Sequence, residues 1–291
     1  MKTRRRSLPA GWYPDSERNV RKQIEGYLAK ADVRQHQAQA AVVPHAGWEF
    51  SGAIAAEAFA TLRMDADVVV VVGGHLGPND GILAASEEGY ETPLGVLSAD
   101  LRLLDEMRHR LRIADDRHAD NTTEVQFPFV KYFFPSARAL ALRASPSDDA
   151  VQLGRVLSEA SDRLGRTVVV VGSTDLTHYG SNYGYVPHGS GPHALQWVTE
   201  VNDRRFIESL LAGSFRQALQ RSHQERSACS AGGAVAAGSY GAARSLAPGL
   251  VLRYMTSHDV YPSESFVGYV GIVWPTITNP AHDRSSEGTK P

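Results

Sequence analysis

Three short apolar runs, each followed by a histidine, constrain the fold of this chain more than any other feature. The runs and the histidines that follow them are Ala40–Val43 with His45, Val68–Val72 with His75, and Val168–Val171 with His178. Valine-rich runs without polar alternation are typical of strands that helices cover on both faces of a parallel sheet. In such sheets, ligands bind beyond the carboxyl ends of the strands. The sequence therefore predicts a buried sheet and one site that the three histidines share.

Segments with helical periodicity separate the apolar runs and indicate the fold class. Val20, Ile24 and Leu28 recur every four residues, and apolar residues recur at helical spacing over 150–164. Strands that alternate with helices favour an α/β fold. We expect a single-domain layered sandwich with a central mixed, mainly parallel sheet flanked by helices.

The ends of the chain differ from its middle in composition. We expect a disordered basic N-terminus over residues 1–10, one α/β domain over 11–275 and a polar tail over 276–291. Two runs near the end of the domain, Val251–Ser257 and Val267–Trp274, predict an antiparallel pair that closes the sheet.

Two segments leave their structure or role open. In the segment Asn121–Phe129, an extended chain would place Glu124 and Gln126 on one side, whereas a helix would place Asn121 and Glu124 on one face. The Gly- and Pro-rich segment Gly180–Pro192 predicts a mobile loop able to cover the crevice.

Composition and charge exclude several classes of partner. The 291 residues carry 30 basic and 32 acidic side chains, so a net charge of −2 favours neither nucleic acid nor a membrane surface. The only cysteine, Cys229, cannot form an intramolecular disulfide, and the N-terminal residues lack the apolar run of a signal peptide. We therefore expect a cytoplasmic protein that acts on a small molecule, with a homo-oligomer left open.

Two imidazoles and one thiol form the candidate metal-binding set. His45, His75 and Cys229 each adjoin a glycine or lie near one at the end of a predicted element, and imidazole with thiolate suits zinc, iron or copper. Taken singly, a cysteine can be a buried apolar residue and a histidine can simply bond to backbone. Asp175 and His178 lie three apart, which fits a carboxylate beside a general acid or base, or only a cap on the following turn.

Several short motifs in register resemble the MEMO family, which includes bacterial proteins labelled AmmeMemoRadiSam system protein B. The matching stretches are Gly11–Pro14, Val43–Gly52, Gly73–His75, Glu124–Phe129, Ser173–Gly180 and the region of Cys229. The resemblance implies the α/β fold of the LigB-type extradiol dioxygenases. It also implies that His45, His75 and Cys229 match the metal-binding positions, with Asp175 and His178 in the same pocket.

Three departures from these families concern the same region. The third iron ligand of LigB-type enzymes is a carboxylate, whereas the matching position here is Cys229. The family's Glu-His-Ser type run corresponds to Asp120–Thr122, and its Gly-Pro-Ser-His corresponds to the shorter Gly73–His75. The last two changes fit a pocket adapted to another substrate, or drift.

We therefore expect a mononuclear non-haem iron oxygenase that uses O2 on a small phenolic or aromatic substrate. Its Fe(II), with Cu or Zn as alternatives, would be held by His45, His75 and Cys229, and His178 and Asp175 would be catalytic. We assign substrate binding to Trp48, Glu124 and Gln126. The alternatives are a hydrolase with Cys229 as nucleophile and a non-catalytic metal-binding, redox or interaction protein.

Overall fold

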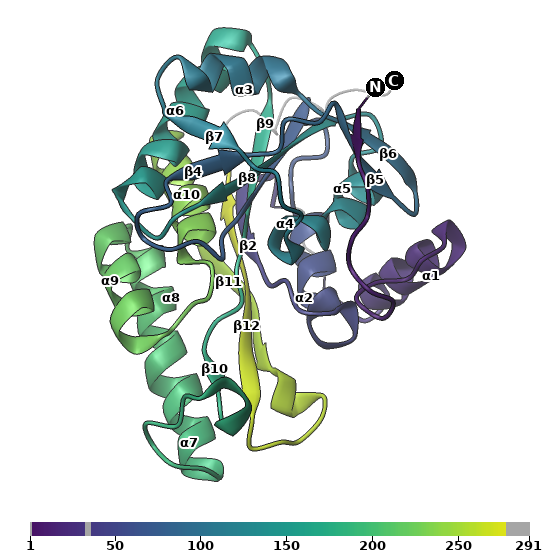
Figure 1. The fold of residues 1–291 in the computed structure, drawn as a ribbon. Helices are drawn as coiled ribbons and strands as arrows, with labels where there is room; N and C mark the ends of the chain where they lie inside the picture. Colours follow the sequence, from purple (N-terminus) through teal and green to yellow (C-terminus); the bar gives the residue numbers. More distant parts are fainter. Residues whose placement is uncertain (1, 33–35, 278–291) are drawn as a thin grey trace, which may run out of the picture.

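A nine-stranded mixed sheet forms the centre of the protein in the computed structural model, which describes residues 2–32 and 36–277 (Figure 1). The strand order is β10-β12-β2-β9-β3-β8-β4-β7, and β11 pairs with β12. The bounds of these strands are β2 Ala38–Val43, β3 Val68–Gly73, β4 Ile82–Ala84, β7 Ile113–Asp115, β8 Arg138–Ala144, β9 Val168–Ser173, β10 His178–Tyr179, β11 Leu250–Thr256 and β12 Phe266–Pro275.

The three apolar runs of the sequence form adjacent parallel strands at the centre of this sheet. Strand β9 lies between β2 and β3 and is parallel to both, and β8 continues the parallel set on the far side of β3. Strand β12 is antiparallel to β11, as the sequence predicts, and also to β2. The predicted α/β class with a central mixed sheet is confirmed.

Helices cover both faces of the sheet (Figure 1). Their bounds are α1 Glu17–Leu28, α2 Trp48–Ala60, α3 Leu101–Arg108, α4 Asn121–Glu124, α5 Phe127–Phe133, α6 Asp148–Leu164, α7 Pro192–Trp197, α8 Asp203–Leu211, α9 Phe215–Glu225 and α10 Ala231–Ala243. A π-helical segment, Val198–Asn202, joins α7 to α8. Along β3, Val68, Val70 and Val72 face one apolar cluster and Val69 and Val71 face the other, which explains why the run has no polar alternation.

Helix α10 packs against the sheet with almost no space between the two backbones. A β-carbon on Gly172 of β9 would overlap the carbonyl oxygen of Gly233 in α10, and one on Gly233 would overlap that of Val72 in β3. Only glycine permits this approach. Because α10 begins two residues after Cys229, the same contacts fix the height of the thiol above the sheet.

The N-terminal residues are ordered, so the prediction of a disordered segment over 1–10 is wrong for residues 2–10. Strand β1, Thr3–Arg4, pairs in parallel with β5, Gly89–Thr92, which pairs in turn with β6, Gly95–Ser98. The Arg4 side chain forms an ion pair with Glu87 and donates to two backbone carbonyls, which supplies the reason for the order. Of the predicted tail, 278–291 lie outside the described residues.

Two open predictions resolve into local helices. The stretch after Asp120 is helical in α4 and α5, and the Asp120 carboxylate caps α4 by accepting from the Thr122 N–H at 2.9 Å. The predicted loop 180–192 contains a short 3-10 helix, Ser181–Tyr183, and its mobility stays a prediction. Within the described residues, no helix is both long and apolar enough to cross a membrane.

Candidate metal centre

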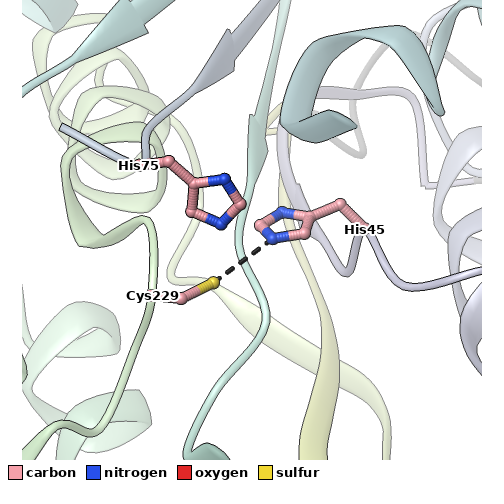
Figure 2. A group of neighbouring side chains, drawn as sticks. All are labelled: His45, His75 and Cys229. Atoms are coloured by element: carbon pink, nitrogen blue, oxygen red, sulfur yellow. Dashed lines mark hydrogen bonds between the residues drawn. The ribbon is translucent and has the colours of Figure 1, made fainter. Parts of the chain in front are cut away.

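Two histidine rings and the single thiol meet beyond the carboxyl ends of the central strands (Figure 2). His45 lies in the loop between β2 and α2, His75 follows β3, and Cys229 precedes α10. The Cys229 Sγ lies 3.2 Å from the His45 Nε2, and the two imidazole centroids lie 5.0 Å apart with their planes at 85°. One donor atom from each residue lies within 4.8 Å of the other two. The predicted convergence of these three residues is therefore present in the structure.

The chemistry of this donor set fits a transition-metal ion. Zinc–nitrogen and zinc–sulfur bonds of about 2.0–2.3 Å allow two donors on one ion to lie roughly 3.3–4.5 Å apart. The three donor atoms lie within 4.8 Å of one another, so they are within a few tenths of an ångström of that range. Imidazole nitrogen with thiolate sulfur suits zinc, copper and iron rather than calcium or magnesium. Three protein donors also leave positions for further ligands.

Polar contacts behind the His45 ring orient its metal-facing nitrogen. The His45 Nδ1 lies 3.4 Å from the Ser173 hydroxyl, so a proton on Nδ1 leaves Nε2 free to face the thiol. The Gln126 amide donates to this same hydroxyl at 3.1 Å and to the Pro44 carbonyl at 2.8 Å. Gln126 is fully buried, so its predicted role in substrate binding is corrected to support of the His45 loop.

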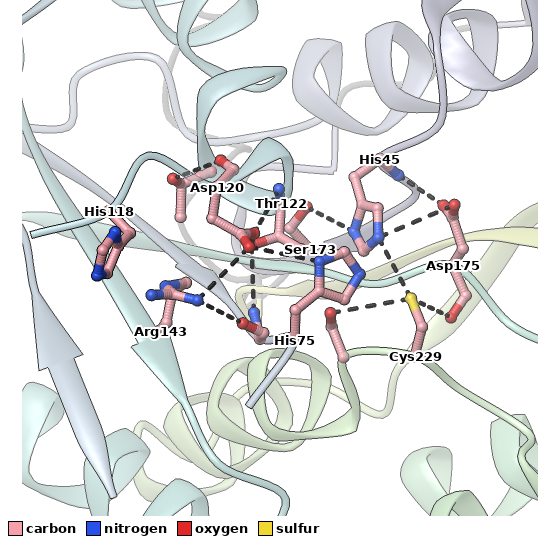
Figure 3. Close-up of polar contacts among 12 residues, drawn as sticks. His45, His75, His118, Asp120, Thr122, Arg143, Ser173, Asp175 and Cys229 are labelled. Carbon is pink, nitrogen blue, oxygen red and sulfur yellow. Dashed lines mark hydrogen bonds and ion pairs between the residues drawn. The ribbon is translucent and has the colours of Figure 1, made fainter. Parts of the chain in front are cut away.

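A longer chain of charged groups orients His75 from behind (Figure 3). The His75 Nδ1 lies 3.4 Å from an Asp120 carboxylate oxygen, which lies 3.5 Å from the Arg143 guanidinium. Arg143 is buried in β8 and forms two hydrogen bonds to Asp116, at 2.7 and 2.8 Å. The sequence analysis missed Asp116 and Arg143. The one available signal was an arginine that follows four apolar residues inside the strand.

The charges in this cluster favour a thiolate and protonated imidazoles when no metal is bound. Burial opposes ionisation of Cys229, but the charge of His45 and the nearby imidazoles of His178 and His75 outweigh it and hold the thiol pKa well below its ordinary value. Burial lowers the pKa of His45, yet Asp175 and Cys229 raise it to about 9 overall. For His75, the hydrogen bonds to Asp120 and Cys229 overcome burial and raise the pKa to about 10.

Asp175 and His178 lie in the same site, on the loop that follows β9. One Asp175 oxygen accepts from the His45 backbone N–H at 2.7 Å, and the other lies 4.0 Å from the His178 Nε2, too far for a hydrogen bond. The His178 Nε2 is buried and has no hydrogen-bond partner among the described residues. Burial lowers the His178 pKa, but Cys229 and Asp175 more than reverse this and raise it. An unpartnered basic nitrogen at this place is suited to exchange a proton with a ligand.

A cleft of about 420 Å³ opens onto the imidazoles. His45, His75, Asp175 and His178 line it on the polar side. Its remaining wall is largely aromatic and includes Trp12, Phe50, Tyr183, Tyr261 and Tyr269. The volume and apolar lining are those of a small-molecule pocket. None of these aromatic residues was predicted, because they come from four separate segments.

The structure also corrects the roles predicted for Trp48 and Glu124. The Trp48 ring is buried against Phe129 at a centroid distance of 4.0 Å and does not line the cleft. The buried Glu124 carboxylate accepts from the backbone N–H groups of Ser7 and Leu8, both at 2.9 Å, and from the Tyr13 hydroxyl at 3.0 Å. Glu124 thus holds the N-terminal segment that carries Trp12 to the cleft.

The fold and the site define an α/β protein with a two-histidine, one-cysteine cluster at the carboxyl edge of its sheet. The sequence model of the family described as Memo-like protein matches residues 4–273, so the chain belongs to the Memo-like family. A MEMO1 family protein of Pyrococcus abyssi is 32% identical over 252 residues, which cover 80% of this chain and 86% of that protein.

Further comparisons extend over most of the chain. A MEMO1 family protein of Pyrococcus furiosus is 30% identical over 290 residues, covering 92% of this chain and 98% of that protein. The crystal structure of an uncharacterized protein from Escherichia coli K12 gives a TM-score of 0.48 at 12% identity, over 88% of this chain and 92% of that one.

Proposed function

We propose that this protein is a mononuclear non-haem iron oxygenase that acts on a small aromatic compound. The observation that carries the proposal is the opening of an aromatic-walled cleft directly onto two imidazoles that lie beside a thiol. Iron, when bound, would supply the redox chemistry toward O2. Copper or zinc would fit the same donors.

The residues of this chain would hold the metal, orient the substrate and move protons. His45, His75 and Cys229 would be the ligands, and the aromatic wall would stack on a planar substrate ring. His178 would accept a proton at Nε2 from a phenolic hydroxyl in the cleft, because this nitrogen has no hydrogen-bond partner among the described residues. Asp175 would stabilise the imidazolium that results, from 4.0 Å.

Oxygen consumption tests this function. The protein would be loaded anaerobically with Fe(II), its metal content measured, and O2 uptake followed with a set of catechols and simple phenols. We expect substrate-dependent uptake that falls at least about 100-fold in His178→Asn, the range typical of a lost general base. His188→Asn, at an exposed histidine outside the cleft lining, is the matched control. Filled sites that consume no O2 with any of these compounds would count against the proposal.

A second candidate is a hydrolase in which Cys229 is the nucleophile. The 3.2 Å contact between the Cys229 Sγ and the His45 Nε2, with the lowered thiol pKa, favours it. This function predicts turnover of esters or amides by protein treated with a chelator, with complete loss in Cys229→Ala. A non-catalytic metal-binding protein would instead bind metal through the same residues and show neither activity.

A further inference from the structure

A second cavity adjoins the candidate metal centre from the side of the thiol. It has a volume of about 330 Å³, and its walls include Cys229, Tyr185, Ser222 and Arg226. His178 and Tyr183 line both this cavity and the larger cleft, whereas Cys229 lines only the smaller one and His45 and His75 only the larger. The centre can therefore be approached from two sides that differ in chemistry. The aromatic cleft leads to the imidazoles, and the smaller cavity leads to the sulfur.

Arg226 gives the smaller cavity a positive charge that is not held in an ion pair within the described part of the chain. Its guanidinium lies 5.2 Å from the centroid of the Tyr185 ring and contacts the Gly184 carbonyl only at 3.5 Å. On the same helix, Arg216 pairs with Asp148 and Arg221 pairs with Glu225. Among the residues that the structure describes, no carboxylate forms an ion pair with Arg226. A guanidinium in this state is free to bind a planar anion through two parallel hydrogen bonds.

The backbone at Arg226 gives a second, independent reason to ascribe a role to this side chain. Arg226 ends helix α9 in the left-handed conformation, with φ 49° and ψ 36°. Glycine is the usual residue at such a helix end, because a β-carbon is unfavourable there. Non-glycine residues that keep this conformation are concentrated at functional sites. An arginine at this position indicates that its side chain serves a purpose that glycine cannot.

We propose that the smaller cavity binds the carboxylate of a small organic acid, with Arg226 as the cation. A single guanidinium balances a single negative charge, whereas a phosphate would leave an excess of negative charge near the Cys229 sulfur. Leu176 and Ala228 provide apolar surface for the carbon chain of the acid, and Ser222 a hydroxyl. The volume lies at the lower end of the range for ligand pockets, which leaves ample room for a small organic acid.

The single cysteine of the chain provides a direct assay, because Cys229 lines this cavity. The rate of Cys229 alkylation by iodoacetamide would be measured on metal-free protein with increasing butyrate, and separately with butyramide, which has the same shape without the charge. We expect butyrate to slow alkylation at least about fivefold at saturation, and butyramide to have no effect. Equal protection by the two compounds, or none by butyrate, overturns the proposal.

Variants at Arg226 and at Arg216 assign the effect to Arg226. Arg226→Gly should abolish the protection and still fold, because glycine suits the left-handed backbone. Arg226→Lys should retain part of the protection by butyrate. Arg216→Gln, which alters an exposed pair outside the cavity, should leave the protection unchanged. Protection that persists in Arg226→Gly, or that inorganic phosphate gives and butyrate does not, contradicts the proposal. Because no metal is present, the outcome does not depend on whether the protein is an oxygenase.

Discussion

At the scale of single residues, the two histidines of the centre differ in the group that lies next to their Nδ1 atom. His45 has a neutral hydroxyl at 3.4 Å from its Nδ1, whereas His75 has the Asp120 carboxylate at the same distance. A carboxylate behind a ligating histidine fixes its tautomer and increases its basicity. Burial raises the pKa of Asp120, but His75 and the hydrogen bonds from Thr122 outweigh it and hold this pKa well below its ordinary value, and Arg143, held by Asp116, lies 3.5 Å from the same carboxylate. His75 should therefore be the stronger ligand of the two.

Asp120→Asn should lower the affinity for Co(II) or Zn(II) about 10- to 100-fold, the usual effect of losing such a partner. The amide can still cap α4, as Asp120 does now, so we expect the variant to fold, with a loss of unfolding free energy on the order of a few kcal/mol from the ion pairs with His75 and Arg143. Chelator competition measures the affinity, and urea unfolding measures the stability. The control is Asp115→Asn, which alters an exposed pair with Arg108. Equal affinities of Asp120→Asn and wild type would remove this role for Asp120.

The ligands were predictable from sequence, but the residues that orient them were not. His45 and His75 each follow an apolar run, and a sheet edge brings such positions together whatever lies between them. Arg143 comes near His75 through the pairing of β8 with β3, which places it beside Gly73, and Asp116 follows the edge strand β7. The substrate-binding assignments failed at Trp48, Glu124 and Gln126 because a motif marks residues that matter without showing which way they point.

At the scale of elements, the junction between the π-helical segment and α8 directs two successive side chains, Asn202 and Asp203, toward one loop. Asn202 donates to the Thr177 hydroxyl at 2.9 Å, and the Asp203 carboxylate accepts from the Thr177 N–H at 3.1 Å and from its hydroxyl. Thr177 lies between Asp175 and His178. A π-helical turn is rare and often adjoins a functional site. Here it holds the loop that carries the candidate acid–base pair.

Asp203 gives this support a dependence on pH. Burial raises its pKa to about 7, despite the opposing hydrogen bonds from Thr177 and Tyr254. The folded state therefore keeps the proton above pH 4, where the unfolded chain loses it, so stability should fall as pH rises from about 4 to about 7. In Asp203→Asn this fall should be smaller by on the order of a few kcal/mol. Urea unfolding at pH 4, 6 and 8 measures the free energy of unfolding of both proteins. The same pH dependence in variant and wild type would show that Asp203 does not titrate in this range.

At the scale of the whole molecule, the N-terminal segment is a structural part of the cleft. Arg4 joins it to the Asp116 region, and Glu124 holds Ser7, Leu8 and Tyr13. This ordering was not predictable, because a strand of two residues pairs with β5 more than 80 positions away and leaves no periodic signal. The central sheet was predictable because its valine runs are long and apolar, and such runs are stable only when they are buried in the core.

Glu124→Gln should loosen this segment, because the amide replaces one carboxylate acceptor by a donor that faces N–H groups. We expect a loss of about 1–3 kcal/mol in unfolding free energy. Hydrogen exchange should rise over residues 2–13, and binding of aromatic ligands should weaken as Trp12 loses its place. The control is Glu106→Gln, which alters an exposed pair with Arg163 and should change neither the hydrogen exchange of residues 2–13 nor the binding of aromatic ligands. Unchanged exchange at Ser7 and Leu8 in Glu124→Gln would show that Glu124 is not the clamp.

The glycine contacts between α10 and the sheet have a consequence for how such a centre can change in evolution. At Gly172 and Gly233 the two backbones are in direct contact. No side chain lies between them that could change its conformation and so keep the sulfur in place. One added methyl group there would push back the start of α10, and the sulfur would retreat from the rings while every donor atom remained in the sequence. A descendant that kept His45, His75 and Cys229 but lost either glycine would therefore retain all three ligands in its sequence and bind no metal ion.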